Sequence, residues 1–591
     1  MLSDDPHHAA TSWLAGFNAA LRSGDAASVA ALFLPEAHWR DLIAFGPDFT
    51  TLSGADAIGR RLAETLPRIA PSHLRLDPSR TPPRRVMRAG ESVVEAIFAF
   101  DTAAGPANGV LRLVPTADGP RAWTMLTALE GLHGQAEGAP DAVHGTRQFS
   151  GDNWADRREK ARAYADHDPT VVVVGAGQAG LAIAARLGAM GIDALVIDRH
   201  QRVGDNWRKR YHALTLHNEV HVNHFPYMPF PPTWPVYIPK DKLANWFEAY
   251  AEAMELNVWT GTELAGGEYD EASGHWQVRL RRADGTERVM RPRHLVFATG
   301  VSSIPYRPKL PGLDDFAGTV MHSGAFLSGA EWRGKCALVL GTGTSGHDVA
   351  QDLQANGAEV SIIQRSPTYV VSLKEAQAVY ALYSEGIAFE DCDLIATASP
   401  YPVLRRAYQL STARSAEIDK PMIDGLMARG FQFTLGEDET GFQMMYLRRG
   451  GGYYFNVGCS ELIAEGKVGL LQYADIETFT AEGARLRDGR TIPADLIVLA
   501  TGYESQQEVV RRALGDAIAD RIGPVWGFDD GGELRNMWRP TAQPGLWFTA
   551  GSLAQSRIFS KYLALQIKMV ESRNENGRMH KDVQAAVISA P

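Results

Sequence analysis

Two glycine-rich turns of the same kind constrain this chain more than any other feature. Gly175-Ala-Gly177-Gln178-Ala-Gly180 follows the apolar run 171–174, and Gly341-Thr-Gly343-Thr-Ser345-Gly346 follows the apolar run 337–340. A buried strand that enters GxGxxG and then a helix sets backbone amides and a helix N-terminus against a pyrophosphate. Two such turns predict two dinucleotide sites, and electrons that pass between them.

Bulk properties narrow the class of protein. A chain of 591 residues is too long for one core and predicts two to four domains. A net charge of −10 without a long basic block argues against a nucleic-acid partner. The apolar runs are of strand length, far below the roughly 20 residues of a membrane span, and the N-terminus lacks a basic segment followed by an apolar one. We therefore expect a soluble, cytoplasmic protein without a membrane partner.

The cysteines exclude one route for the electrons. Cys336, Cys392 and Cys459 are the three in the chain, and no two form a CxxC pair. This usage is typical of a reducing compartment, and a flavin-to-dithiol relay would need two close cysteines. We expect no metal site either, since no ligand set is evident.

The first part of the chain predicts a separate α+β cone, residues 1–140. Helical patterns at 13–21, 27–33 and 54–66 precede strand-like runs at 93–100, 110–114 and 123–129. His38, Arg40 and Asp41 show no decisive catalytic spacing, so we favour a structural or interface role, with an enzyme or binding pocket as alternatives.

From residue 169 strands and helices alternate, which predicts α/β domains with doubly wound parallel sheets. We expect two Rossmann-like dinucleotide-binding domains, the first discontinuous and the second inserted into it. The expected boundaries are 141–168 for a linker with a charged helix, 169–330 and 496–575 for the first domain, 331–495 for the second, 373–430 for a helical insertion over the active site, and 576–591 for a tail.

The turn at 175–180 has the context of a nucleotide site. Asp198 ends the following strand, 18 residues past Gly180, where a carboxylate accepts hydrogen bonds from ribose hydroxyls. The alternative is a tight structural turn.

Further segments identify the chain with a family. Gly204-Asp-Asn-Trp207-Arg208, then Tyr211-x-x-Leu-x-Leu-His217-Asn218, and the stretch 224–240 resemble the flavin-containing monooxygenases, particularly YUCCA-type and N-terminally extended bacterial relatives. The run 316–326 fits FxGxxxHxxx[YF], which that family shares with Baeyer-Villiger monooxygenases, although Leu327 stands where a basic residue is usual. Residues 1–140 resemble SnoaL-like, nuclear-transport-factor-like domains.

The resemblance implies FAD at the first turn and a nicotinamide at the second. It places crossings between the two domains at Thr299-Gly300 and Thr501-Gly502, and the flavin near Gly551. His322 then couples domains rather than moving protons. The residues that we expect to bind cofactors are Gly175, Gly177, Gln178, Gly180, Asp198, Gly204, Trp207, Arg208, His217, Thr299, Gly300, His322, Gly341, Gly343, Ser345, Gly346, Arg365, Ser366, Thr501, Gly502 and Gly551.

The second turn indicates which nicotinamide is used. Gln364, Arg365 and Ser366 end the next strand, where NAD-selective folds usually carry an acid. An Arg with a neighbouring hydroxyl suits a 2'-phosphate, so we expect NADPH, with NADH tolerated. The alternative is that Arg365 is a solvated strand-end residue.

The resemblance implies a monooxygenase that forms a flavin hydroperoxide and transfers one oxygen atom from O2 to a small organic substrate. We expect His217, with Asn218, to contact the flavin or its peroxide, or else to hold its strand in place. Gln555, Ser556, Arg557 and Lys561 are candidates for the flavin edge or the substrate entrance, and Arg557 is a candidate catalytic group.

Heteroatom oxygenation of nitrogen or sulfur and Baeyer-Villiger oxidation of ketones are equally compatible with these residues. The rival functions are an NADPH oxidase or electron-transfer reductase without oxygen insertion, and a binding protein that acts through the cone. A homodimer is compatible with the cone.

Overall fold

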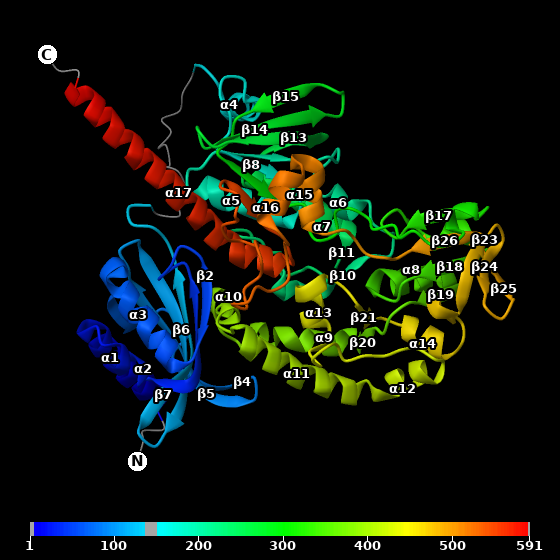
Figure 1. Cartoon of the computed structure of the whole chain (residues 1–591), viewed down its shortest axis with the longest axis horizontal. Helices are drawn as coiled ribbons and strands as arrows, with labels where there is room; N and C mark the ends of the chain where they lie inside the picture. The colour runs from blue at the N-terminus through cyan, green and yellow to red at the C-terminus, as the bar shows by residue number, and fades with distance from the viewer. Residues whose placement is uncertain (1–4, 136–149, 589–591) are drawn as a thin grey trace.

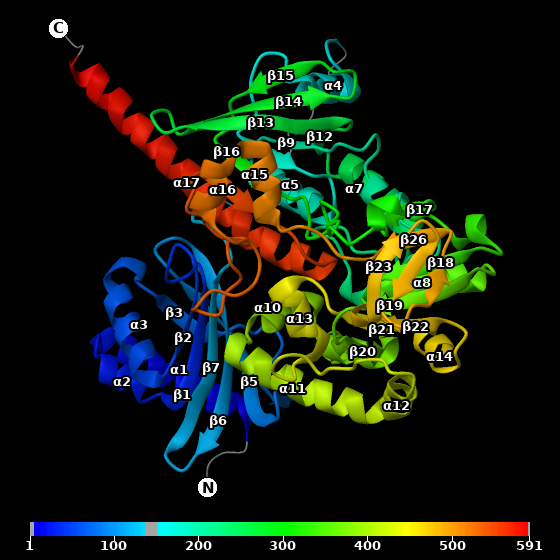
Figure 2. The same cartoon turned by 45° about the vertical axis from the view of Figure 1, so that its right-hand side comes forward.

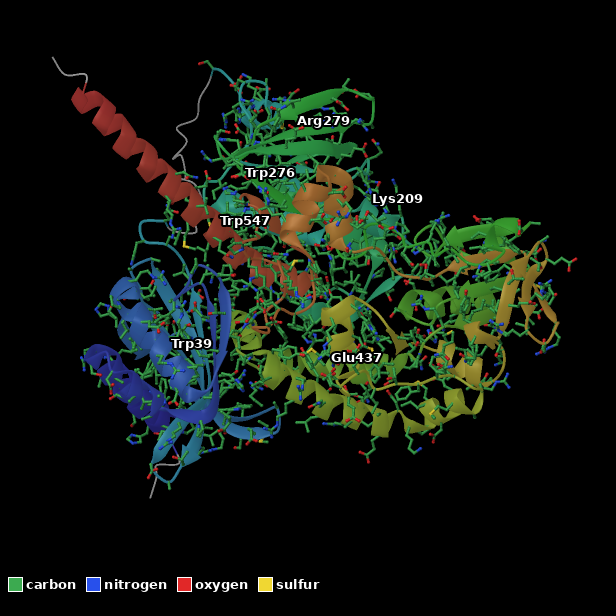
Figure 3. All side chains as sticks on the ribbon, viewed as in Figure 1. Trp39, Lys209, Trp276, Arg279, Glu437 and Trp547 are labelled. Atoms are coloured by element: carbon green, nitrogen blue, oxygen red, sulfur yellow. The ribbon has the colours of Figure 1, made fainter. Side chains whose placement is uncertain are left out.

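The computed structural model describes residues 5–135 and 150–588, with side chains described through residue 574. An N-terminal cone lies at one end, two parallel sheets form the rest of the body, and a layer of helices runs from the cone to the second sheet (Figures 1 and 2). Trp39 lies in the cone, Trp547 lies in the first parallel sheet, and Trp276 lies beside that sheet (Figure 3).

The cone is a seven-stranded sheet against three helices. The strand order is β2-β1-β7-β6-β5-β3, with β4 paired to β5, and β1 runs parallel to β7 while the other pairs are antiparallel. Its elements are α1 (Pro6–Ser23), α2 (Ala26–Ala30), β1 (Phe33–Leu42), β2 (Phe49–Ser53), α3 (Ala55–Ile69), β3 (Ser72–Leu76), β4 (Arg84–Arg88), β5 (Glu91–Asp101), β6 (Pro106–Thr116) and β7 (Gly119–Leu129).

Four of these strands, β1 to β4, are absent from the sequence prediction, which also extended the second helix to residue 33. Phe33 instead begins β1. The sequence pattern did not indicate β1 because the strand carries polar groups that form hydrogen bonds inside the cone. Thr127 Oγ1, from β7, donates to Asp41 Oδ1 at 2.5 Å, and Trp39 Nε1 donates to Thr127 Oγ1 at 2.8 Å. Burial raises the pKa of Asp41 to about 7 despite these bonds.

The first glycine turn belongs to a five-stranded parallel sheet, ordered β12-β9-β8-β16-β27. Because β27 comes from the end of the chain, this sheet is left and re-entered. Its strands are β8 (Val171–Val174), β9 (Ala194–Ile197), β12 (Asn257–Trp259), β16 (His294–Phe297) and β27 (Leu546–Phe548). The surrounding elements are α4 (Trp154–Ala163), α5 (Gln178–Ala189), α6 (Asp205–Arg208), β10 (Thr215–Glu219), β11 (Tyr237–Pro239), α7 (Lys240–Ala253), β13 (Thr262–Asp270), β14 (His275–Arg282), β15 (Glu287–Met290), α15 (Gln506–Leu514), α16 (Asp516–Ile522) and α17 (Leu553–Ile588).

The second glycine turn belongs to another five-stranded parallel sheet, ordered β17-β26-β18-β19-β22. Its strands are β17 (Thr319–His322), β18 (Cys336–Leu340), β19 (Glu359–Gln364), β22 (Gly469–Gln472) and β26 (Leu496–Leu499), with α8 (Thr344–Ala355) and α14 (Cys459–Ala464) beside them. A small sheet of β23 (Ile476–Thr480), β24 (Gly483–Leu486) and β25 (Thr491–Pro493) follows β22.

The expected boundaries at 330 and 496 therefore need correction. Strands β17 and β26 pair with each other, and β26 pairs with β18, so both belong to the second sheet. The sequence pattern could not show this, because a short apolar strand gives no sign of which sheet it joins. The polypeptide crosses between the sheets before residue 319 and after residue 499.

Helices occupy the segment predicted to be an insertion. They are α9 (Leu373–Ala376), the 3-10 helix η4 (Gln377–Ser384), α10 (Phe389–Thr397), α11 (Tyr401–Ile418) and α12 (Lys420–Ala428), and α13 (Gly441–Arg449) continues the layer beyond residue 430. The two-stranded sheet of β20 (Tyr369–Ser372) and β21 (Tyr453–Asn456) brackets them.

The predicted tail and the predicted linker each include residues that the structure does not describe. Helix α17 runs through residue 576, where a tail was expected, and residues 589–591 lie outside the described residues. The expected linker begins among residues 136–149, which also lie outside them, and continues into α4. Among the described helices, none is both long enough and apolar enough to cross a bilayer.

Buried charges attach the cone to the helical layer. The Glu95 carboxylate accepts from Arg88 Nη2 at 2.7 Å and from Arg112 Nε at 3.1 Å, and Arg112 is 1% exposed. The same Arg112 guanidinium donates to Ser399 Oγ at 2.9 Å and to the Ala398 carbonyl at 3.2 Å, just past the end of α10. One side chain thus bridges β6 and α10.

Arg112→Leu should destabilise the protein because it removes this bridge and leaves part of the Glu95 charge uncompensated. We expect a loss of about 3–5 kcal/mol, the usual cost of breaking a buried ion pair, measured by urea denaturation. Arg121→Leu is the matched control on β7, because its partner Asp118 is exposed, and it should change stability by less than about 1 kcal/mol. Equal effects of the two substitutions would contradict this role of Arg112.

Candidate functional site

The first turn is closed by backbone contacts that only glycine permits. Gly175 has φ +113°, and a Cβ there would lie 2.6 Å from the Ala298 carbonyl oxygen. A Cβ on Gly180 would lie 1.8 Å from the Gly175 carbonyl oxygen. Gly177 precedes the first residue of α5, so the helix N-terminus opens directly onto the turn. This is the geometry of a pyrophosphate site.

Three predicted cofactor residues from distant segments meet beside this turn. Gln178 Nε2 donates to the Gly551 carbonyl oxygen at 3.1 Å, and Trp207 Nε1 donates to Gln178 Oε1 at 3.4 Å. Gln178 therefore connects the start of α5 to α6 and to the loop that follows β27. The tertiary structure brings the late glycine to the first turn, as a flavin site in this part of the fold requires.

Asp198 lies at the end of β9, next to the turn. Its Oδ2 accepts from the Ala176 backbone N–H at 2.8 Å, and its Oδ1 accepts from the His200 backbone N–H and ring Nδ1, each at 2.8 Å. Burial opposes its ionisation, but these hydrogen bonds hold the pKa below its ordinary value. Asp198 is thus an anion that orders the loop beside the first turn.

Gly204 and Arg208 attach α6 to α7. Gly204 has φ +87°, and a Cβ there would lie 2.4 Å from the Ala244 carbonyl oxygen. Arg208 Nη1 donates to Asp205 Oδ1 at 2.6 Å, and its Nη2 lies 3.3 Å from Glu248 Oε2. These contacts turn Arg208 toward α7.

The two crossing segments differ in the hydrogen bonding of their threonine hydroxyls. Thr501 Oγ1 donates to the Tyr306 carbonyl at 2.6 Å. Thr299 Oγ1 is buried and has no hydrogen-bond partner among the described residues. Thr299 and Gly300 directly follow β16, at the same sheet edge as the first turn, so this free hydroxyl is available to a ligand.

His322 binds backbone groups through both ring nitrogens, one of them at the second crossing. The Gly324 backbone N–H donates to Nδ1 at 3.0 Å, and therefore Nε2 carries the proton and donates to the Gly502 carbonyl at 2.9 Å. Burial lowers the pKa of His322, which keeps the ring neutral. With both nitrogens engaged by backbone, His322 positions the chain.

The second turn repeats the first. Gly341 has φ +118°, and a Cβ on Gly346 would lie 1.9 Å from the Gly341 carbonyl oxygen. Gly343 precedes α8, whose second residue is Ser345. At the end of β19, Gln364 is buried in an amide network, whereas Arg365 and Ser366 are exposed and have no side-chain partner in the described part of the chain. Both are free to meet a 2'-phosphate.

His217 and Asn218 lie on β10, facing the helical layer. Gln377 Nε2 donates to the His217 carbonyl at 2.8 Å, which fixes the strand, and the His217 ring packs on Phe455 at 4.7 Å. The His217 side chain keeps solvent-accessible surface, yet the surrounding protein lowers its pKa to about 4. The imidazole is therefore neutral. Burial raises the pKa of the Tyr380 hydroxyl to about 12, while the Asn218 side chain, which lies near it, lowers that pKa.

Among the four candidates near Gly551, Arg557 is held by the protein itself. Its Nε and Nη2 bind the Asp393 carboxylate at 2.8 and 2.7 Å, and its Nη1 donates to the Val222 and His224 carbonyls. These bonds use four of its five N–H donors, and the side chain is 4% exposed. Lys561 pairs with Glu130 of the cone.

The other two candidates lie close to the first turn. Gln555 Oε1 accepts from the Ser552 backbone N–H at 3.0 Å, directly after Gly551, and from the Tyr446 hydroxyl at 3.4 Å. Ser556 Oγ is buried without a partner among the described atoms.

Sequence reasoning missed two side chains that the helical layer brings to β10. Gln377 bonds the His217 carbonyl and Tyr380 lies near Asn218, and both come from a segment without a motif. The one available signal was the expected position of residues 373–430 over the active site.

Comparisons with known proteins agree with these two turns. A family model described as pyridine nucleotide-disulphide oxidoreductase matches residues 172–384. The indole-3-pyruvate monooxygenase YUCCA1 of Oryza sativa subsp. japonica is 34% identical over 349 residues, 59% of this chain and 80% of that protein. The probable indole-3-pyruvate monooxygenase YUCCA4 of Arabidopsis thaliana is 31% identical over 350 residues, 57% of this chain and 76% of that protein.

Solved structures share the fold. The open crystal structure of cyclohexanone monooxygenase superposes with a TM-score of 0.50 at 19% identity, over 70% of this chain and 89% of that one. With its paired glycine turns, its joined crossings and these relatives, the chain belongs to the flavin monooxygenase family.

Proposed function

We propose that this protein is a FAD-dependent NADPH monooxygenase of small organic substrates. The overall reaction is substrate + O2 + NADPH + H+ to oxygenated substrate + H2O + NADP+, so one oxygen atom enters the product and the other leaves as water. The observation that carries the proposal is the pair of equivalent glycine turns, each with a helix N-terminus opening onto it; His217 and Asn218 lie on a strand that the helical layer contacts through Gln377.

The first turn fits FAD on structural grounds. The backbone around Gly175 and Gly180 leaves no room for a Cβ, the N-terminus of α5 faces the turn, and the Thr299 hydroxyl is buried without a partner among the described residues. Asp198 would hold the ribose, and Gln178 would hold the Gly551 loop against the cofactor. FAD, when bound, supplies the two-electron chemistry that activates O2.

The second turn fits NADPH. Gly341, Gly343 and Gly346 would hold the pyrophosphate, Ser345 lies in the first turn of α8, and Arg365 with Ser366 would bind the 2'-phosphate. NADH remains a weaker donor, because its ribose gives the Arg365 fork no anion to bind.

His217 is the group that we propose to face the reacting atoms. Its neutral ring offers one donor and one acceptor, and Phe455 and Gln377 fix its position. Asn218 lies next to it on β10. For Arg557 we propose a positioning role in place of the catalytic one, since Asp393 and two carbonyls occupy its guanidinium.

The organisation of the chain is proposed on the same basis. The cone is a SnoaL-like domain, which its helices packed on a curved mixed sheet support. The flavin domain has two parts that flank a nicotinamide domain bounded by β17 and β26. We further propose a cytoplasmic protein of the N-terminally extended bacterial type, in keeping with three free cysteines; a homodimer is compatible with this organisation.

Gly180→Ala should abolish FAD retention, because the added methyl overlaps the Gly175 carbonyl and opens the turn. Gly188→Ala is the matched control in the same helix, since nothing lies within 4 Å of its added Cβ, and it should stabilise α5 by up to about 1 kcal/mol. Flavin absorbance per mole of purified protein measures the result. Normal FAD content in Gly180→Ala would contradict the assignment of the first turn.

Arg365→Ala should raise the KM for NADPH at least about tenfold and leave the KM for NADH nearly unchanged, because one charge-assisted phosphate contact is lost. Steady-state nicotinamide oxidation measures both values. Arg490→Ala is the control, an exposed arginine in the turn between β24 and β25. If the ratio of the two KM values does not move, Arg365 does not bind the 2'-phosphate.

The oxygen balance tests the function itself. With 18O2 and a panel of ketones, amines and thioethers, at least one substrate should yield a product that carries one 18O atom per NADPH consumed, with little H2O2. Stoichiometric H2O2 and no labelled product across the panel would favour the oxidase alternative. NADPH-driven reduction of an added electron carrier without O2 uptake would favour the reductase.

A further inference from the structure

Helix α10 lies beside the N-terminal cone (Figures 1 and 2) and also contacts the start of α17. Two of its acidic residues, Asp391 and Asp393, are two positions apart, which sets their side chains about 200° apart around a helix. Asp391 faces the cone, whereas Asp393 faces Arg557. The helix therefore makes one charged contact on each of two opposite sides.

The cone holds α10 at both ends. Near the start of the helix, Arg80 pairs with Asp391 Oδ1 at 2.5 Å, and the backbone N–H of the next cone residue donates to Asp391 Oδ2 at 2.7 Å. Asp391 is 1% exposed, so these cone groups are what compensates its charge. At the other end, Arg40 Nη1 donates to the Thr397 carbonyl at 2.9 Å, beside the bonds of Arg112 described above.

The opposite side of α10 holds Arg557. The Asp393 carboxylate binds Nε and Nη2 of Arg557 at 2.8 and 2.7 Å, and the Phe389 ring centroid lies 4.4 Å from the centre of the guanidinium. Nη1 of the same guanidinium donates to the Val222 and His224 carbonyls at 2.9 and 2.8 Å. Arg557 thus ties α10 and α17 to the segment that follows β10.

The two segments that Arg557 joins adjoin groups that we assign to the flavin site. Helix α17 begins at Leu553, directly after the loop of Gly551, whose carbonyl accepts from Gln178 at 3.1 Å. The other segment continues β10, which carries His217. A displacement of Arg557 would therefore reach both the Gly551 loop and the strand of His217.

The cone also contacts α17 directly, one turn beyond Arg557. Lys561 Nζ binds the Glu130 carboxylate at 2.5 Å, and the Phe49 and Tyr562 rings pack edge to face with their centroids 6.0 Å apart. Because the cone binds both α10 and α17, it fixes the relative position of the two helices that the buried ion pair connects.

We propose that the cone positions the flavin site through α10, and that Asp393 is the positioning residue of this connection. By holding Arg557, Asp393 keeps the start of α17 and the segment after β10 in one fixed arrangement. This inference rests on the proposed monooxygenase function and deepens it, because it gives the cone a part in keeping NADPH oxidation coupled to oxygen transfer.

Hydrogen–deuterium exchange of the purified full chain tests the connection without turnover. Asp393→Asn keeps the size of the side chain and removes its charge, so amide exchange should rise at least about fivefold in residues 220–230 and 553–560, as the loss of a charge-assisted hydrogen bond allows. Arg80→Gln weakens the contact on the cone side and should raise exchange in the same two segments at least about twofold. Unchanged exchange there in Asp393→Asn, or a rise in Arg80→Gln that is confined to the cone and α10, would overturn the proposal.

Glu390→Gln is the matched control. Glu390 lies in the first turn of the same helix, is exposed and has no side-chain partner among the described residues, so this substitution should leave exchange unchanged. The second parallel sheet is the internal reference, since it should exchange at the wild-type rate in every variant. A rise in Asp393→Asn that extends equally over that sheet would show general destabilisation and would contradict the positioning role.

The FAD-loaded enzyme gives a second readout. Asp393→Asn should shift the visible absorbance spectrum of the bound flavin. It should also raise the H2O2 released per NADPH at least about threefold, measured with a substrate that the 18O2 panel identifies, because a small misplacement of the site lowers the rate of oxygen transfer. Glu390→Gln should match the wild-type protein in both measurements. An unchanged spectrum together with an unchanged H2O2 ratio in Asp393→Asn would count against the proposal.

The positioning role and the monooxygenase function fail in different ways. If the wild-type protein holds no FAD or does not oxidise NADPH, the monooxygenase proposal fails, and the exchange measurements still decide whether the cone and Asp393 position the two segments. If the wild-type protein couples NADPH oxidation to oxygen transfer but the variants exchange as it does in residues 220–230 and 553–560, the positioning role alone fails.

Discussion

The close approach of residue 180 to the Gly175 carbonyl is the constraint on which the first half of the enzyme depends. With 1.8 Å between that oxygen and a Cβ on Gly180, α5 can start against β8 only because no side chain intervenes. The same approach recurs between Gly346 and Gly341 at 1.9 Å. Each turn points a helix N-terminus at one edge of its sheet, and the polar groups of each site are arranged around that edge.

The two sheets are joined by a small number of polar contacts near these turns. His322, on β17 of the second sheet, donates to Gly502, where the chain leaves that sheet. The Tyr211 hydroxyl, from the segment between α6 and β10, donates to Asp348 at the start of α8, and burial raises the pKa of Asp348 to about 6. The Tyr211 contact ties the segment before β10 to the helix of the second turn, and the His322 contact fixes the point where the chain leaves the second sheet.

The N-terminal cone contacts the helical layer and the loop that carries Glu533. Arg112 and Glu95 hold the end of α10, while Arg40 binds Glu533 at 2.6 Å. Because α10 adjoins η4, which carries Gln377 and Tyr380, the cone supports the helical layer that faces His217. These contacts are compatible with the structural or interface role that the sequence favoured for the N-terminal segment, and they place Arg40 between the cone and the rest of the protein.

The sequence by itself determined the local chemistry: strand-turn-helix units around Gly175 and Gly341, the acid at Asp198, and Arg365 in place of an acid. These follow from neighbouring residues, since a GxGxxG turn is encoded within about ten positions. Only the tertiary structure decided which sheet β17 and β26 join, that Asp393 occupies Arg557, and that Gln377 bonds the His217 carbonyl. Those outcomes depend on contacts between residues far apart in the chain, and no local pattern encodes them.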